Sequence, residues 1–580
     1  MEFHLHQQHS ARAVIALAAL FLILSLISGC AASVSGAQAR LLSPTPSQTA
    51  AVTKRPFSTA TPPLASDPPE PRLWISPAVP DGLRAQLKLP ATVKIVQRRQ
   101  DANLWFEVKD PTSINTVTQK VIAKAAWIYV VAVPFPTLAD DADAVGLRRV
   151  WSNNFQGVGD ASLPVGRQPI LMTAQTRAAL EALWGEADPK GVKVVDQASL
   201  LDDAWQSAPA WAILPFEDIQ PRWKVLRLQG DSPLQRNFNP VTYPMTIPFT
   251  LYGSQSTAQA LSAVTRLKSN YDPQKLTVLA MTGTTALSRH IGERMDAKGL
   301  TYPGQAIVGW LSQADLTHIS NEVSFYQDCP KPGPDRADMR FCSNPNYIQL
   351  LEYVGTDIVE LTGNHLLDWG PQPFLDTLAM YQAHGWKTYG GGANVARAQE
   401  PLLIEDHGNR LAFIGCSPSG PANVWATKDL PGSAPCDLPQ MEQEIKQLLA
   451  QGYLPIVTLQ AVETNTYKPA VAQAMPTFRR LAQAGAVIVS GSQSHVPQTM
   501  TFVGENFIHY GLGNLFFDQM DPVEERQEFI DQHVFYDGKY LGVILRTALL
   551  EDYSQPRPMT TAERSDFLQK IFALCDWSGN

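Results

Sequence analysis

The residues that invite a chemical interpretation stand directly after apolar runs in the second half of the chain. In "DIVELTGNHLLDWG", residues 357–370, the apolar run ends at Gly-Asn-His, and Asp368 follows three residues after His365. Imidazole and carboxylate groups are ligands for divalent transition metals such as Zn, Mn or Fe. A metal held by them could polarise a phosphoryl or carbonyl oxygen or activate water.

Polar clusters follow four other apolar runs of the same half. They are Gly283-Thr284, Asn321-Glu322, Gln460 with Glu463, and Ser494-His495. In open α/β folds functional groups gather just beyond the carboxyl ends of strands, so the five clusters are expected to converge. Each also has a structural interpretation, because a histidine after a strand can serve as a hydrogen-bonded structural residue and Asn and Gly form ordinary turns. Asp368 precedes a Gly and a Pro, which favours capping of the next helix or orientation of His365.

The elements that must position these residues are predicted from alternating sequence patterns. From residue 276 onward, strand-like runs such as "LTVLAMTG", "RLAFIGCS" and "AVIVSGSQ" alternate with helical ones such as "QMEQEIKQLLAQG" and "MPTFRRLAQAG". Such alternation predicts sheets covered by helices. Residues 73–253 mix short strand-like runs with helical ones, and a smaller α/β domain is the economical prediction. A chain of 580 residues is too long for one core, which agrees with two folded units.

The first 72 residues carry signals of export rather than of folding. Arg12 precedes an apolar run at residues 13–27 that is too short for a typical membrane span and is interpreted as an export signal. The "ISGC" that follows resembles the lipobox of bacterial lipoproteins, so Cys30 is predicted to be lipidated; the alternative is a chance cysteine after an ordinary signal. Residues 31–72 are rich in Ser, Thr, Pro and Ala and are predicted to be a tether.

The charge and the cysteines of the chain bear on nucleic-acid binding, disulfide formation and zinc binding. The formal net charge is -8 and the chain has no Lys/Arg block, which argues against a nucleic-acid partner. In an exported protein, Cys329 with Cys342 and Cys416 with Cys436 could form disulfides, although sequence does not fix the connectivity. No CxxC or Cys/His spacing points to a zinc site.

Longer stretches resemble two known groups of proteins. "DLTHISNEVSF", "IVELTGNHLLDWG" and "AVIVSGSQSHVPQTMTFVGENFIHYGLGNLFFDQ", in this order, resemble the CapA family of poly-gamma-glutamate capsule biosynthesis proteins over about residues 276–519. The resemblance implies a fold similar to that of calcineurin-like metallophosphatases, a two-sheet sandwich flanked by helices. The earlier half loosely resembles periplasmic solute-binding proteins of the phosphate-binding type. The expected organisation is a lipoprotein signal at 1–30, a linker at 31–72, a solute-binding-like α/β domain at 73–265 and a CapA-like domain at 270–580.

The CapA resemblance implies roles for particular residues. The implied single-metal site, for Mn, Zn or Fe, consists of Glu322, His365, Glu463 and His495. Asn364 and His365 are implied as catalytic residues, and Arg289 and Asn321 as substrate-binding residues. The chain departs from the family pattern at several positions. Thr284 stands where an Asp is common, and Gln460 and Gln493 stand where His residues are common. Glu463 comes one position earlier than the family's glutamate. Neutral amides and a hydroxyl bind transition metals poorly, so a full dinuclear site is not expected.

The resulting functional hypothesis is an exported protein, lipid-anchored at the outer face of the cell membrane. It would take part in making, exporting or anchoring an anionic capsule polymer such as poly-gamma-glutamate, with the polymer or its synthesis and export machinery as partner. If the chain is an enzyme, the resemblance implies metal-dependent hydrolase or transferase chemistry. Two alternatives stay open: a non-catalytic polymer-binding or scaffold lipoprotein, and a solute receptor acting through the N-terminal domain.

Overall fold

A computed structural model describes residues 70–154, 168–261, 264, 266–333, 339–460 and 464–577. These residues belong to one compact unit, Pro68–Asn580. The export signal, Cys30, most of the linker predicted for residues 31–72 and Glu463 lie outside the described residues. Among the helices of the described part, none has the length and apolar character needed to cross a membrane.

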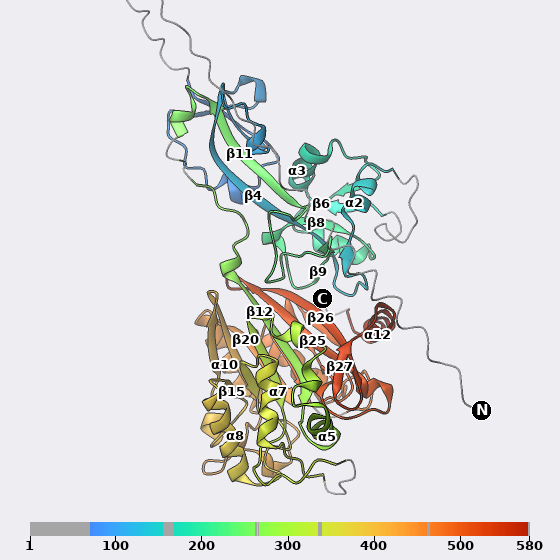
Figure 1. Ribbon diagram of the computed structural model, residues 1–580. Coiled ribbons are helices and arrows are strands. Elements are labelled where there is room, and N and C mark those ends of the chain that lie inside the picture. The colour runs from blue at the N-terminus through green and yellow to red at the C-terminus, as the bar shows by residue number, and fades with distance from the viewer. Residues whose placement is uncertain are drawn as a thin grey trace, which may run out of the picture. The chain divides into compact units, whose positions relative to one another are not determined.

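The first part of the described chain forms a sheet of nine strands in the order β2-β1-β3-β11-β4-β8-β6-β7, with β9 paired to β4. The long strands β4 and β11 run antiparallel, side by side (Figure 1). The strands are β1 (Arg72–Ile75), β2 (Lys94–Ile95), β3 (Leu104–Val108), β4 (Gln119–Pro134), β6 (Ile170–Met172), β7 (Val192–Val194), β8 (Ala212–Pro215), β9 (Trp223–Val225) and β11 (Thr246–Ser254). A separate pair consists of β5 (Asp141–Ala142) and β10 (Arg227–Leu228).

Four helices accompany this sheet, and side-chain caps fix where two of them begin. Asp143 accepts hydrogen bonds from the first backbone N–H groups of α2, and Thr173 does the same for α3. The helices are α1 (Asp81–Arg84), α2 (Ala144–Trp151), α3 (Ala174–Trp184) and α4 (Leu200–Gln206). The predicted α/β character of this part is therefore confirmed.

The second part builds two further sheets. The first has eight strands in the order β15-β14-β13-β12-β25-β26-β27, with β24 paired to β12; the second has six in the order β17-β18-β20-β21-β23-β22. The first sheet contains β12 (Leu276–Thr285), β13 (Leu316–Asn321), β14 (Ile358–Glu360), β15 (Lys387–Tyr389), β24 (Asn514–Phe516), β25 (Gln527–Tyr536), β26 (Lys539–Glu551) and β27 (Gln555–Pro558). The second contains β17 (Leu402–Asp406), β18 (Asn409–Cys416), β20 (Leu454–Gln460), β21 (Ile488–Ser492), β22 (Met500–Val503) and β23 (Asn506–His509). A short pair joins β16 (Gly391–Gly392) to β19 (Gly432–Ser433).

These two large sheets pack face to face. Leu279 and Met281 of β12 share one buried cluster with Phe413 of β18 and Ile456 of β20. Ala280, between the first two, points to the opposite face, as the two-residue period of a strand requires. The core therefore lies between the sheets, and the predicted two-sheet sandwich is confirmed.

Helices cover both outer faces of the sandwich. Helices α5, α7 and α8 share a buried cluster with the outer face of the first sheet, and α10 and α11 share one with the second. Figure 1 shows α7 and α8 beside the strands of this part. The helices are α5 (Arg289–Lys298), α6 (Val308–Leu311), α7 (Ile348–Tyr353), α8 (Pro371–Ala383), α9 (Val395–Ala398), α10 (Leu438–Ala450), α11 (Ala474–Ala484) and α12 (Thr561–Leu574).

Two disulfides close loops of this second part. Cys329 bonds to Cys342, and Cys416 bonds to Cys436. Cys575 has a free thiol. The connectivity that the sequence left open is thus the pairing of near neighbours.

Candidate functional site

The carboxyl ends of β12, β13 and β14 lie at one edge of the first sheet because the three strands are parallel neighbours. The backbone N–H of Glu322 donates to the carbonyl of Thr285 at 3.1 Å, and Val323 pairs with His365 in an isolated bridge. Gly363 makes this approach possible, since a Cβ added there would lie 2.4 Å from Cα of Glu322. The Asn321-Glu322 and Asn364-His365 segments are therefore neighbours, as predicted from the strand ends.

His365 is held by Asp368. Its Nδ1 lies 2.7 Å from Oδ2 of Asp368, and the same oxygen accepts the backbone N–H of Phe341 at 2.7 Å. The phenyl ring of Phe341 lies 4.5 Å from the imidazole, centroid to centroid. The His365 side chain is 17% exposed, and no described residue forms a hydrogen bond with its Nε2. Asp368 thus orients the imidazole and leaves Nε2 available. The predicted capping of the next helix is wrong, because the N-cap of α8 is Gly370 and no side chain caps it.

Opposing effects act on the pKa of His365. Burial, the largest effect, lowers the pKa, whereas the hydrogen bond that His365 donates to Asp368 and the charges of Glu322 and Asp368 raise it. The positive charge of Arg289 opposes these acids, but the net result is a pKa above the usual value for histidine. The site therefore stabilises the imidazolium form of His365 relative to a free histidine.

The second sheet contributes Gln460, which positions Asn364. Nε2 of Gln460 donates to Oδ1 of Asn364 at 3.0 Å, and the hydroxyl of Ser417 donates to Oε1 of Gln460 at 3.3 Å. An amide at a position where the CapA resemblance implies an imidazole therefore acts as a hydrogen-bonding link between the two sheets.

Thr284 likewise has a hydrogen-bonding role in place of the expected carboxylate. The backbone N–H of Gln493 donates to Oγ1 of Thr284 at 3.0 Å. Gln493 adopts a left-handed conformation with φ of 67°. Such a conformation is uncommon for a non-glycine residue and clusters at functional sites, so the loop after β21 is held in a strained form at this edge.

His495 lies on the same loop and has a partner that sequence reasoning missed. Its Nδ1 is 2.8 Å from Oδ1 of Asn514, and its ring lies 4.5 Å from that of Phe517. Asn514 is fully buried and also donates to the carbonyl of Glu525 at 3.0 Å. The "YGLGN" stretch that ends at Asn514 therefore carries a residue that orients a predicted metal ligand.

The two predicted substrate-binding residues are both held by protein partners. Arg289 forms an ion pair with Asp518, and its guanidinium lies 4.8 Å from the ring centroid of Phe341. Asn321 is buried and donates to the carbonyl of Val323 at 2.6 Å and to the hydroxyl of Tyr381 at 2.8 Å. These contacts hold both side chains in place, and their part in substrate binding stays a prediction.

Arg340 brings a positive charge that the sequence analysis did not single out. Its Nε donates to the backbone carbonyl of Asp368 at 2.9 Å, and its guanidinium lies 4.3 Å from the ring centroid of Trp369. The side chain is exposed, and within the described ranges no carboxylate forms an ion pair with it. It lies in the segment between Cys329 and Cys342, where the sequence shows no strand or helix pattern to mark it.

A comparison with known protein families identifies the family of the domain that contains the strand-end site. The bacterial capsule synthesis protein family PGA_cap matches residues 278–519, a span that contains every strand-end cluster described above. Residues 278–519 therefore form a CapA-family domain. The match begins in β12 and ends just after β24, so the matched span contains strands of both sheets and ends before β25, β26 and β27.

Curated relatives agree with this assignment. "Capsule biosynthesis protein CapA" of Bacillus anthracis is 24% identical over 310 residues, which cover 52% of this chain and 74% of that protein. "PGA biosynthesis protein CapA" of Bacillus subtilis is 26% identical over 242 residues, 41% of this chain and 62% of that protein. A "Probable polyglutamine synthesis accessory protein" of Mycobacterium tuberculosis is 27% identical over 192 residues, 31% of this chain and half (50%) of that protein.

Two solved structures that are similar to this chain have low TM-scores. An ABC-type phosphate transport receptor from Vibrio cholerae has 11% identity and a TM-score of 0.27, over 32% of this chain and 87% of the receptor. A 5'-nucleotidase precursor from Thermus thermophilus has 14% identity and a TM-score of 0.30, over 52% of this chain and 59% of that protein. At these scores the similarity carries no functional conclusion.

The predicted metal site of the CapA-family domain can be tested for fit in part. In the part of the chain that the structure describes, Glu322, His365 and His495 do not form a group whose ligand atoms all lie within 4.8 Å of one another. The fourth predicted ligand, Glu463, lies outside the described residues. The described residues of the strand-end site therefore do not by themselves form a ready-made metal centre.

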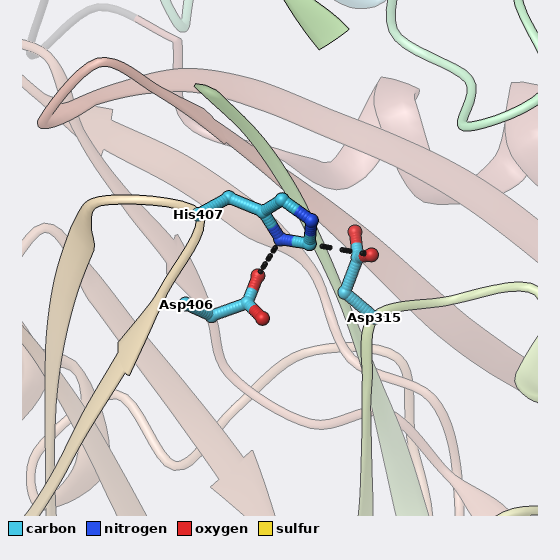
Figure 2. A group of neighbouring side chains, drawn as sticks. All are labelled: Asp315, Asp406 and His407. Carbon is cyan, nitrogen blue, oxygen red and sulfur yellow. Dashed lines mark hydrogen bonds and ion pairs between the residues drawn. The ribbon is translucent and has the colours of Figure 1, made fainter. Parts of the chain in front are cut away.

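A different group does have metal-ligand spacing. Asp315, Asp406 and His407 each offer a ligand atom, and these atoms lie within 4.8 Å of one another (Figure 2). Nδ1 of His407 is 2.6 Å from Oδ2 of Asp406 and 3.9 Å from Oδ1 of Asp315. Asp315 precedes β13, and the other two lie at the turn between β17 and β18, so the group sits at the amino end of β13.

An arginine already supplies positive charge to this second group. Nε of Arg236 lies 2.8 Å from Oδ1 of Asp315, and Nη2 lies 2.6 Å from Nε2 of His407. The guanidinium of Arg236 thus already contacts Asp315 and His407. A metal ion bound to Asp315, Asp406 and His407 would have to displace this guanidinium. Sequence reasoning missed the group because its members come from the ends of strands that are distant in the chain.

Proposed function

We propose that the CapA-family domain acts on an anionic capsule polymer of the poly-gamma-glutamate type at the strand-end site. The observation that carries the proposal is His365, whose Nδ1 is fixed by Asp368 and whose Nε2 has no described protein partner. A histidine oriented in this way can give or take a proton at Nε2. Family membership supports the choice of polymer.

The neighbouring residues support specific roles in this proposal. The raised pKa of His365 favours donation of a proton from Nε2 to a leaving group of the polymer chain. Asn364, held through Oδ1 by Gln460, would orient a substrate oxygen with its Nδ2. The exposed guanidinium of Arg340 would bind a carboxylate of the polymer through paired hydrogen bonds. The resulting reaction class is hydrolysis or transfer.

No step of this proposal is routed through a metal ion. A divalent ion such as Mn, Zn or Fe would polarise a substrate oxygen when bound. The described ligands Glu322, His365 and His495 do not converge, and the four-ligand site that includes Glu463 stays a prediction. Elemental analysis of the purified protein tests it directly.

The experiment compares the wild-type chain with His365→Ala and with a matched control, His384→Ala. His384 is an exposed histidine that follows α8; its Nδ1 contacts the carbonyl of Met380, and its ring lies 4.9 Å from that of Trp386. Amide-hydrolase and phosphoesterase activity and metal content are measured in all three. Loss of activity in His365→Ala alone supports the proposal, whereas equal activity in all three chains contradicts it.

A second candidate is a non-catalytic polymer-binding or scaffold protein. The observation that favours it is that Thr284, Gln460 and Gln493 replace expected ligands and form protein hydrogen bonds instead. Polymer binding that persists in the presence of a chelator, without turnover of any substrate tested, would favour this candidate.

Export and anchoring complete the proposal. Lipidation of Cys30 would hold the chain at the outer face of the membrane, with the polymer or its synthesis and export machinery as partner. The two disulfides support an oxidising compartment, since such bonds are rare in the cytosol. Membrane fractionation of wild-type and Cys30→Ser cells tests the anchor, and a Cys30→Ser chain that remains in the membrane fraction would argue against it.

A further inference from the structure

A cavity of about 510 Å³ lies among β26, α12 and the segments around β5 and β9. β26 contributes Arg546, α12 contributes Arg564 and Phe572, and Asp140 and Lys224 come from the earlier segments. The volume falls within the range of small-molecule sites. The described residues of the strand-end site do not line this cavity, so it is a separate feature of the molecule.

The charged lining of the cavity is unbalanced. Its charged residues are Asp140, Asp141, Lys224, Arg227, Arg546 and Arg564. Asp140 is shared, with Oδ1 at 2.7 Å from Nζ of Lys224 and Oδ2 at 2.7 Å from Nε of Arg564. Asp141 pairs with Arg227 at 2.6 Å. Four cations face two carboxylates, so the lining carries a formal excess of two positive charges.

Arg546 is the cation with no acidic partner. Across the described residues no carboxylate forms an ion pair with it, and its Nε donates to Oε1 of Gln532 at 2.8 Å. Its guanidinium lies 5.7 Å from the ring centroid of Trp310, whose carbonyl accepts from Nε2 of Gln532 at 2.7 Å. The neutral contacts fix the direction of the guanidinium and leave its Nη groups for another acceptor.

The surroundings make the charge of Arg546 costly. The pKa of Arg546 is lowered to about 10; burial is the largest cause, the charges of Arg227 and Arg564 act in the same direction, and the charge of Asp140 opposes them. A bound anion would offset this cost. A guanidinium matches a carboxylate or phosphate because both of its terminal nitrogens can donate in parallel.

The remaining walls of the cavity are apolar and aromatic. Trp223, Trp310, Leu568 and Phe572 are among the lining residues. Such walls stabilise an apolar ligand body by removing it from water. A fully hydrated inorganic ion has no apolar surface to bury against these walls.

We propose that this cavity binds a small organic anion. Its carboxylate or phosphate group lies on the Arg546 guanidinium, and its apolar body packs against Trp223 and Leu568. The site is separate from the strand-end site of the CapA-family domain and does not depend on the function proposed for that domain.

The test is calorimetric titration of the full-length chain, purified in detergent, with benzoate and phenyl phosphate. Benzyl alcohol and inorganic phosphate serve as probes that lack the charge or the apolar body. At least one aromatic anion is expected to bind about tenfold more tightly than both of these probes, because benzyl alcohol lacks the charged hydrogen bond and inorganic phosphate lacks the buried apolar body. Which anion binds decides between carboxylate and phosphate. Binding of neither anion, or equal binding of inorganic phosphate, would overturn the proposal.

Variants locate the binding. Arg546→Gln is expected to weaken it about tenfold or more, and Arg546→Lys by less, because lysine keeps the charge but not the paired donors. Arg410→Gln is the matched control, since Arg410 stacks on Tyr453 at 4.0 Å and donates to a carbonyl outside the cavity. Leu568→Trp fills the cavity and leaves all charges intact. Wild-type affinity in Arg546→Gln or in Leu568→Trp, with melting temperatures showing folded protein, would overturn the proposal.

Discussion

Asp368→Asn separates the charge of Asp368 from its shape. The wild-type carboxylate accepts from Nδ1 of His365 and from the backbone N–H of Phe341, each at 2.7 Å. Asparagine keeps an oxygen acceptor of similar size but removes the negative charge. Since that hydrogen bond and charge are among the effects that raise the pKa of His365, and burial opposes them, the pKa of His365 should fall in the variant.

The expected loss of stability depends on pH. Because the folded-state pKa of His365 is raised, its contribution is complete below the unfolded value of about 6.5 and is lost as pH rises through the folded value. A hydrogen bond to a charged group contributes about 1.5–3 kcal/mol; both partners are charged near pH 5.5, whereas only Asp368 is charged near pH 9. The variant should therefore lose unfolding free energy near the upper end of this range, about 3 kcal/mol, at pH 5.5 and near its lower end, about 1.5 kcal/mol, at pH 9.

The assay is urea unfolding followed by tryptophan fluorescence at both pH values, together with an NMR titration of the histidine rings. Asp376→Asn is the matched control, because Asp376 is an exposed carboxylate of α8 that accepts a hydrogen bond from Gln372. The control should show the same small change at both pH values. An Asp368→Asn loss that is equal or larger near pH 9, or an unchanged pKa of His365, would refute the reasoning.

Three further predictions concern stability. Gly363→Ala should cost about 1–3 kcal/mol in urea unfolding, because its Cβ would lie 2.4 Å from backbone, whereas Gly309→Ala, with its nearest atom at 3.8 Å, should be tolerated; equal effects would contradict this. Replacing Cys329 and Cys342 together by Ser should cost about 3 kcal/mol, from the separation of 13 residues, and a change below about 1 kcal/mol would contradict it. Arg236→Ala should cost about 2 kcal/mol and make the melting temperature sensitive to added Zn²⁺, whereas the wild type should not respond; a zinc response of equal size in both would contradict the role of this arginine.

The sandwich was predictable because its strands and helices follow local patterns. Alternate residues of β12, such as Leu279 and Ala280, face the inter-sheet core and the helices. The proximity of the segments that contain Glu322 and His365 was also predictable. The two segments follow parallel strands, and the carboxyl ends of neighbouring parallel strands lie at the same edge of a sheet.

The contacts that complete the site could not be predicted in the same way. Asn514, which orients His495, and Arg340, which contacts Asp368, are brought in by loops without periodic patterns. The second group, with Arg236 beside His407, joins residues 171 positions apart. Local propensity carries no information about such pairs, because they depend on how the finished sheets and loops pack.

The disulfide between Cys329 and Cys342 has a bearing on how firmly the strand-end site is held. It covalently closes the loop that contains Phe341, whose backbone N–H donates to Asp368. Asp368 in turn accepts from Nδ1 of His365 and fixes its imidazole. A chain with reduced thiols lacks this tie, so the loop is free to exchange among more conformations and the histidine is less firmly aimed. Reduction of this disulfide is therefore expected to loosen the loop at Phe341 and, through Asp368, the orientation of His365.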